Sequence, residues 1–267
     1  MAKIKEALKT FWTHAWELLK SSFLAMLFYG MASTICFMGL LNEEWTGKLT
    51  EGMNGARIAW IVIAAVLVVA YHCVLSYANG SKGYEMLVSG NMKRLSAERL
   101  GSTMKISSHK EVQEYREWKG FVSGGIIAFF TVLFGVLMAA NAEKINAALA
   151  VIAEISATGE STSATIASGT GALLVISCLL SGWSILPFVF VNLAGASVSY
   201  LWSCLFGILP ILASGIMYIV GAYGKRAKNT KAQEEADRAA AAEAAKQKPK
   251  KINYGGLPGT KPNKKKK

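Results

Sequence analysis

The sequence predicts an all-α integral membrane protein, a helical bundle of five to six transmembrane helices. Four uncharged stretches lead to this prediction, and the longest contains 64 residues without one Asp, Glu, Lys or Arg. These stretches are Ser21–Leu41, Ile58–Tyr77, Phe121–Ala140 and Ser161–Gly224. Uncharged blocks of about 20 residues match the hydrocarbon thickness of a bilayer. Composition agrees, because only 17% of the residues are charged, whereas soluble domains contain roughly 25%.

Residues 1–20 precede the first span and are predicted to form an interfacial amphipathic helix. Apolar residues recur there at helical spacing with lysines between them, and Trp12 and Trp16 suit the headgroup zone of a bilayer. The alternative is that these residues are the solvated first turns of the first span. The transmembrane bundle is expected to occupy residues 21–224.

A long polar segment, residues 78–120, separates the second and third spans and is expected to be a cytoplasmic loop. Its first half is predicted to be irregular because it contains four glycines, Gly80, Gly83, Gly90 and Gly101. In its second half, Ser108 and Glu111 have the spacing of a capping box. Apolar residues then recur at Val112, Tyr115 and Trp118. This pattern predicts an amphipathic helix on the bilayer surface that leads into the third span.

The numbers of Lys and Arg residues in successive loops predict the orientation of the spans, because basic loops face the cytoplasm. The counts are four before the first span, two in the first loop, eight in residues 78–120 and one in residues 141–160. We therefore expect the N-terminus in the cytoplasm and residues 141–170 in an extracytoplasmic loop. The tail, residues 225–267, has 14 basic and 4 acidic residues and is expected in the cytoplasm.

The last uncharged stretch leaves three topologies open. Three spans bring the chain outside by Ala140, so a cytoplasmic tail requires an odd number of further crossings. Six spans are favoured, because the stretch would extend roughly 96 Å as helix and one crossing needs about 30 Å. The last three would be Ala164–Trp183, Ile185–Leu201 and Cys204–Tyr223. Alternatively, Gly171–Tyr200 forms a re-entrant hairpin and the chain crosses four times, or it has five spans with the tail outside.

No catalytic, cofactor-binding or metal-ligating pattern is found, so we expect no cofactor, no metal site and no enzymatic activity. Three polar positions within the spans are candidates for function: Tyr71, His72 and Asn192. His72 is ionisable, and ionisable groups inside a membrane are a functional hypothesis by default; it would otherwise face the interface. Asn192 lies between Pro187 and Gly195, where a helix break is expected, and would satisfy that break or bond to another helix.

Tyr115, Trp118 and Lys119 precede the third span and are predicted interfacial anchors, because aromatic rings and lysine stems suit the headgroup level. The tail, residues 225–267, is predicted to be largely disordered apart from a helix-favouring part at 239–245. It is either simply solvated or binds anionic lipid headgroups, where each lysine contributes about 1 kcal/mol. Contact with nucleic acid is the weakest alternative, because no aromatic platform accompanies the basic residues.

The residues from Glu114 to Phe121 read Glu-Tyr-Arg-Glu-Trp-Lys-Gly-Phe. They resemble an E-Y-x-x-(W/F)-K-G segment that leads into a span in small polytopic membrane proteins of Gram-positive bacteria, a group without assigned function. The last span is similar in pattern, with Pro210, Tyr218 and Lys225. The resemblance implies a multi-pass protein of the bacterial inner (plasma) membrane with its tail inside the cell, and it implies no activity.

For function, the sequence favours a non-enzymatic membrane component, namely an accessory, scaffold or transport-associated subunit with a membrane protein as its partner. The basis is the lack of charged residues in the spans, the amphipathic segments and the basic tail. The alternative is a small-solute transporter or channel whose site lies in the broken region, residues 185–200. A membrane enzyme is a third alternative, for which Tyr71, His72 and His109 are the available polar residues.

Overall fold

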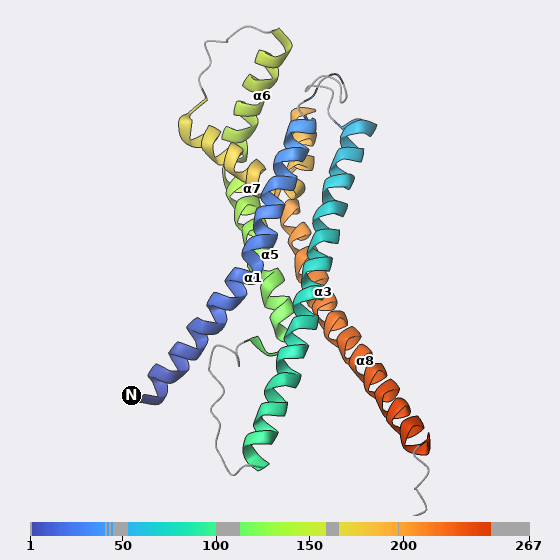
Figure 1. Cartoon of the computed structure of the whole chain (residues 1–267). Helices are drawn as coiled ribbons and strands as arrows, with labels where there is room; N and C mark the ends of the chain where they lie inside the picture. Colours follow the sequence, from blue (N-terminus) through green and yellow to red (C-terminus); the bar gives the residue numbers. More distant parts are fainter. Residues whose placement is uncertain are drawn as a thin grey trace, which may run out of the picture. The chain divides into compact units, whose positions relative to one another are not determined.

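The computed structural model describes residues 2–40, 42, 44, 53–99, 113–158, 166–196 and 198–246. The chain divides into two compact units, Met1–Lys225 and Arg226–Lys267, which are described separately. The helical elements in the described residues (Figure 1) are α1 (Ala2–Leu40), α3 (Gly55–Arg99), α5 (Trp118–Ala140), α6 (Ala142–Thr158), α7 (Ser168–Leu193), η2 (Tyr200–Gly207) and α8 (Ile208–Lys246).

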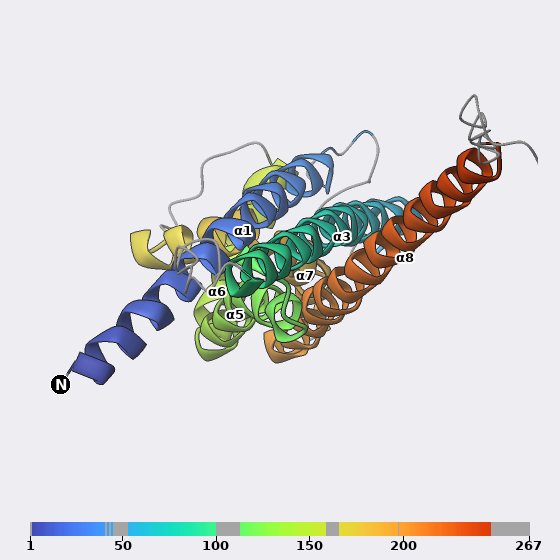
Figure 2. The same ribbon diagram turned by 60° about the horizontal axis from the view of Figure 1, so that its bottom comes forward.

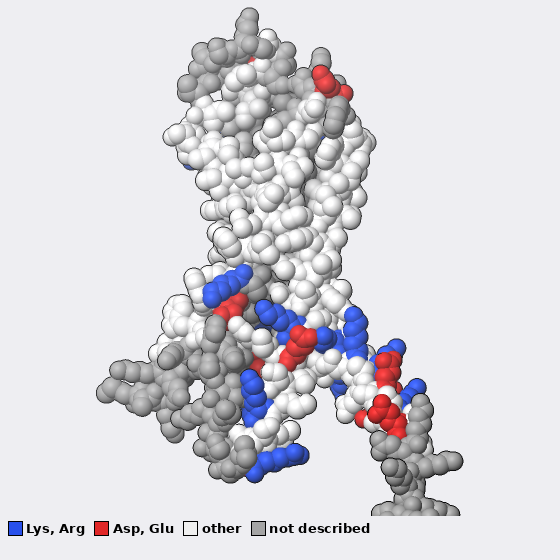
Figure 3. Space-filling model, viewed as in Figure 1, with Lys and Arg blue, Asp and Glu red and all other residues white. Residues whose placement is uncertain are grey.

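The helices of the first unit present an apolar surface to their surroundings. Large apolar side chains face outward, and Val66, Val74 and Phe129 are 60%, 70% and 59% exposed. Figure 3 shows this uncharged belt, with the charged side chains gathered beyond it. Among the described residues, five helices are long and apolar enough to cross a membrane, and no strand is present. The prediction of an all-α membrane bundle is therefore confirmed.

Helices α1 and α5 run in one direction, and α3 and the membrane part of α8 run in the other (Figure 1, Figure 2). Close approaches between the helices require this arrangement, because α3 is antiparallel to α1 and parallel to α8, while α5 is antiparallel to η2 and α8. The contacting pairs are Gly39–Trp60, Phe28–Tyr71, Ser76–Ser214, Ser81–Gly221, Gly124–Pro210 and Gly135–Cys204. The start of α1, the end of α3, the start of α5 and Lys225 thus share one end of the unit. We call it the charged end, and the opposite end the far end.

Helix α7 consists of two helical segments that meet at Ser181, where the backbone is not helical (φ −132°, ψ 18°). At this bend the Trp183 N–H donates to the hydroxyl of Ser33 on α1, at 3.3 Å. Further along α7, the Phe190 ring lies 4.9 Å from the guanidinium of Arg57, at the far end where α3 begins. The first segment starts beside α6, which follows α5 at the far end as well (Figure 1). Both ends of α7 therefore lie at the far end, with the bend inside the bundle.

This geometry makes α7 a re-entrant hairpin rather than a crossing. Its segments, residues 168–180 and 182–193, each extend only about 20 Å as helix, and a crossing needs roughly 30 Å. The six spans favoured from the sequence are therefore not present among the described helices. The alternative of four crossings plus a hairpin agrees with the structure, and it places the start of α1 and Lys225 on one side.

The hairpin bends at Ser181 and Gly182, not at the predicted positions. Pro187 lies within the second segment, where the helix continues past it. Asn192 lies near the end of that segment, and its Oδ1 accepts the Val198 N–H at 2.9 Å, so it stabilises the turn that leaves α7. Gly182 fits the bend because a Cβ there would contact the Ser33 side chain at 3.3 Å.

Helix α3 continues to Arg99, so the loop expected in the first half of residues 78–120 is a helix instead. Three of the four glycines that suggested irregular structure lie inside it and are buried. A Cβ at Gly80 would collide with the Tyr218 carbonyl of α8, and one at Gly83 would lie 2.9 Å from the Tyr218 hydroxyl. These glycines therefore let α8 approach closely, a role that glycine has in membrane bundles.

Of the amphipathic surface helix predicted before α5, Gln113 is helical and residues 114–117 are not. Residues 108–112 lie outside the described residues. The chain at Tyr115 and Arg116 is not helical, and the Tyr115 N–H donates to the Gly83 carbonyl at 3.0 Å. This hydrogen bond ties the segment to α3, and α5 begins at Trp118.

Three further boundaries differ from the prediction. Residues 3–20 continue into the first span as one uninterrupted helix, α1. Within the expected loop 141–170, Ala142–Thr158 forms α6, and its buried Ile145, Ala148 and Leu149 explain why a helix forms there. In the second unit, α8 continues as an exposed helix to Lys246, and residues 247–267 lie outside the described residues.

Candidate functional site

A pocket of about 300 Å³ opens at the charged end of the first unit, between α1, α3, α5 and α8. Its lining is polar for a membrane protein. The ionisable residues are His14, Glu17, Lys20, Lys82 and Lys119, and Ser76, Asn79, Ser214 and Tyr218 are among the others. Four helices contribute to this lining, so its shape depends on how the bundle packs at this end.

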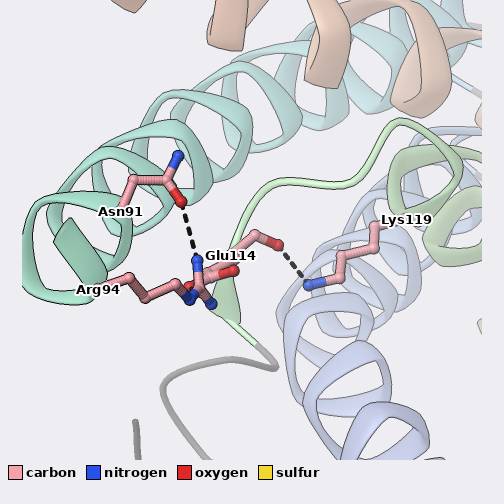
Figure 4. Close-up of polar contacts among 4 residues, drawn as sticks. All are labelled: Asn91, Arg94, Glu114 and Lys119. Atoms are coloured by element: carbon pink, nitrogen blue, oxygen red, sulfur yellow. Dashed lines mark hydrogen bonds and ion pairs between the residues drawn. The ribbon is translucent and has the colours of Figure 1, made fainter. Parts of the chain in front are cut away.

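Lys119, a predicted interfacial anchor, is buried in the wall of this pocket and is only 7% exposed. Its Nζ donates to the Glu114 carbonyl at 2.6 Å (Figure 4). A buried ammonium requires hydrogen-bond partners to offset its desolvation. The carbonyl fixes the position of Lys119, so the pocket carries a positive charge in a defined place.

The Glu114 carboxylate, which is also buried, faces α3 and accepts a charge-assisted hydrogen bond from Arg94 at 2.8 Å. Arg94 also donates to Asn91 Oδ1 at 2.9 Å (Figure 4). A Cβ at Gly90 would collide with the Glu114 carboxylate. Glu114 therefore links α3 through its side chain to α5 through its carbonyl, and it holds residues 113–117 beside the pocket.

Tyr115 adds an aromatic contact to this link. Its ring stacks on Tyr218 with centroids 5.3 Å apart and planes at 11°. Burial, followed by the nearby Glu117 carboxylate and Tyr223, raises the pKa of Tyr115 above its usual range. The predicted anchor Trp118 is 43% exposed, with its ring 6.0 Å from that of His14 on α1. Both aromatic residues thus lie at the charged end, as a position near the headgroups requires.

Buried polar groups continue from the pocket into the bundle. Ser76 and Ser214 line the pocket, are both buried, and hydrogen-bond at 3.2 Å. One helical turn deeper, His72 is 1% exposed, and its ring meets Tyr29 edge to face with centroids 5.9 Å apart. The Pro210 carbonyl lies beside the ring, yet neither ring nitrogen makes a hydrogen bond of standard geometry to any described residue.

The hairpin α7 brings further polar groups to the same depth. Trp183 meets Tyr29 edge to face, with centroids 5.5 Å apart. Within the described part of the chain, the Tyr29 hydroxyl, the Trp183 indole N–H and the hydroxyls of Ser177 and Ser181 have no hydrogen-bond partner. Buried polar groups are nearly always paired, and an unpaired one in a membrane costs several kcal/mol. We call His72, Tyr29, Trp183 and Ser181 at the bend the polar core; their polar groups can bind a polar ligand.

No protein-family model, curated protein or solved structure matches this chain.

Of the predicted in-membrane positions, only His72 belongs to this site. Tyr71, its neighbour, stacks on Phe28 with centroids 3.9 Å apart and serves packing. Asn192 lies toward the far end, where it stabilises a turn. The polar core residues of α1 and α7 were not predicted, because serine, tyrosine and tryptophan are common in spans and nothing in the sequence shows that they converge.

Arg57 was also missed, because it was assigned to the first loop. It is fully buried at the start of α3. Its backbone N–H donates to Asn54 Oδ1 at 2.9 Å, and its guanidinium faces the Phe190 ring. The available signal was its position directly before the apolar stretch Ile58–Tyr77. Arg57 is thus a buried cation at the far end of the bundle, as Lys119 is at the charged end.

Proposed function

We propose that the protein is a membrane transport protein that carries a small polar solute through the bundle, from the pocket at the charged end to the polar core. The observation that carries this proposal is the re-entrant hairpin α7, whose bend lies among unpartnered polar side chains. Discontinuous helices in transporters place such groups near the middle of the membrane, where substrates bind.

The route follows from the order of polar residues along the bundle. Lys119 and Lys82 line the pocket, and Ser76 and Ser214 line its deeper part. His72 follows one turn further along α3, and the Tyr29 ring connects it to Trp183 on the hairpin. The solute would pass these groups in turn. Opening between them and Arg57 at the far end would complete the passage.

The accessory role favoured from the sequence loses one of its three arguments. That argument was a lack of buried charged groups, yet Arg57, Glu114 and Lys119 are 0%, 7% and 7% exposed. A dry bundle that served only as a scaffold would gain nothing from this burial, because burying charges costs free energy. Their placement at the two ends of the polar core favours transport.

For orientation, we propose that the charged end faces the cytoplasm. The eight basic residues between Ala78 and Gly120 belong to this end or to the chain that connects α3 with α5, whereas residues 141–160 at the far end contain one. Basic loops stay on the cytoplasmic side during insertion. The solute would then bind from the cytoplasm.

Reconstitution into liposomes tests the proposal. Purified protein should accelerate the flux of at least one solute in a panel of inorganic anions, carboxylates, phosphate esters, amino acids and sugars. His72→Phe fills the same space without a polar group and should reduce that flux at least about tenfold. Tyr71→Phe, the neighbouring residue outside the polar core, is the matched control and should leave flux unchanged. Folded protein without flux for any solute would overturn the proposal.

A further inference from the structure

The ionisable groups of the pocket give it a surplus of positive charge. Lys20, Lys82 and Lys119 line it, and Glu17 is its one carboxylate among the described residues; His14 adds an imidazole ring. We infer that the pocket binds the phosphate group of a small ligand. This site rests on the proposed function, because it would be the first place on the transport route where the solute binds. Phosphate binding is nevertheless measured separately from flux.

Three neighbouring acidic residues do not cancel this surplus, because each has a cationic partner. Glu114 pairs with Arg94, Glu85 with Lys225, and Glu17 with Lys20. Lys82 lies on the pocket-facing side of α3 and makes no ion pair with any described residue. Its charge is therefore available to a ligand.

The remaining polar groups suit an oxyanion rather than a cation. Ammonium groups donate hydrogen bonds and cannot accept them, and the amides of Asn79 and Gln113 add N–H donors to the lining. The position of Lys119 is fixed by the Glu114 carbonyl, whereas Lys82 is exposed and can adapt. One fixed and one adaptable cation can bind different oxygens of a tetrahedral phosphate, in charge-assisted hydrogen bonds.

The volume of the pocket restricts the ligand. About 300 Å³ is the lower end of the range for ligand pockets, roughly 300–1,000 Å³. A phosphate with a small attached group fits this volume. Two sources share this chemistry: a free phosphate ester and the headgroup of an anionic phospholipid, since the exposed Trp12 and Trp16 of α1 place this end near the headgroups.

The full-length protein is titrated with inorganic phosphate and with glycerol 3-phosphate in detergent by isothermal titration calorimetry. In a second arm, native mass spectrometry counts phosphatidylglycerol retained from nanodiscs against phosphatidylcholine. Lys82→Gln should weaken binding about threefold to tenfold, because it removes one partly exposed charge. Lys93→Gln, an exposed lysine further along α3 outside the pocket, should leave binding unchanged.

Glu17→Gln distinguishes electrostatics from structural damage. It removes the lining carboxylate and releases Lys20, so it should tighten phosphate binding, whereas damage to the pocket would weaken it. Lys82-dependent binding in the calorimetric arm assigns the site to a soluble phosphate ester, and binding seen only with phosphatidylglycerol assigns it to lipid.

Three results would overturn the inference: neither arm depends on Lys82, Lys93→Gln weakens binding as much as Lys82→Gln, or Glu17→Gln weakens it. Flux of phosphate-free solutes without phosphate binding would refute the inference and leave the proposed function standing. Phosphate binding without flux of any solute would overturn the proposed function and leave the inference standing.

Discussion

Arg94 and Glu114 form an ion pair with N and O 2.8 Å apart, although 20 residues separate them in the chain. The Glu114 side chain of this pair is only 9% exposed, while that of Arg94 is 40% exposed. The pair joins the end of α3 to the segment that leads into α5, beside the opening of the pocket. Loss of Arg94 would leave a buried carboxylate without its cation.

Arg94→Ala should lower the free energy of unfolding by about 1–2 kcal/mol, because the unpaired Glu114 carboxylate stays buried while the partial exposure of Arg94 limits the effect. Adding Glu114→Gln should recover much of this loss, since no buried charge then remains. Arg99→Ala, at the exposed end of α3, is the control. Unfolding in detergent is measured for wild type, the single variants Arg94→Ala and Glu114→Gln, the double variant and Arg99→Ala, and additive effects of the two substitutions would exclude the coupling.

The close approach of α3 and α8 makes a second prediction. Gly80→Ala should destabilise the bundle by about 1–3 kcal/mol, because the new Cβ collides with the backbone carbonyl of Tyr218 and cannot be accommodated by a rotamer change. Gly125→Ala, where a Cβ meets nothing within 4 Å, should be neutral or slightly stabilising. Equal melting temperatures for the two variants would show that α3 and α8 do not touch at Gly80.

The topology of α7 can be tested by labelling. In a variant without the native cysteines, Gly169→Cys and Ala196→Cys should react with an impermeant reagent from the same side of the membrane, because both ends of the hairpin lie at the far end. Lys93→Cys, at the charged end, should react from the other side. If the two positions that flank α7 react from opposite sides, α7 crosses the membrane.

The Tyr115 phenol should lose its proton at a higher pH than that of an exposed tyrosine. Its pKa lies above the usual value because the phenol is buried at the charged end, and an exposed tyrosine titrates near pH 10. The unfolded chain therefore loses this proton first, so Tyr115 contributes its full stability below about pH 10 and loses it as pH rises through the folded pKa. The absorbance of phenolate in wild type minus Tyr115→Phe measures this titration, and a midpoint at the ordinary value would contradict the burial.

Much of the fold follows from the sequence, because the bilayer requires long apolar helices and the three isolated uncharged stretches correspond to α1, α3 and α5. The glycines of α3 were misleading, since a glycine in a loop and a glycine in a helix crossing look alike until the facing helix is known. The bend of α7 depends on contact with Ser33, a residue far away in sequence. The polar core also depends on contacts between residues far apart in sequence, because His72, Tyr29 and Trp183 come from three helices.

The hairpin also has a consequence for biogenesis. Because α7 enters and leaves on the same face, neither of the segments that flank it has to be carried through the lipid when it inserts. Deleting residues 168–193 would thus leave Lys225 on its present side, whereas deleting any one crossing helix would invert every helix that follows. The directions of α1, α3, α5 and α8 along the bundle are therefore independent of α7, because α7 begins and ends at the far end.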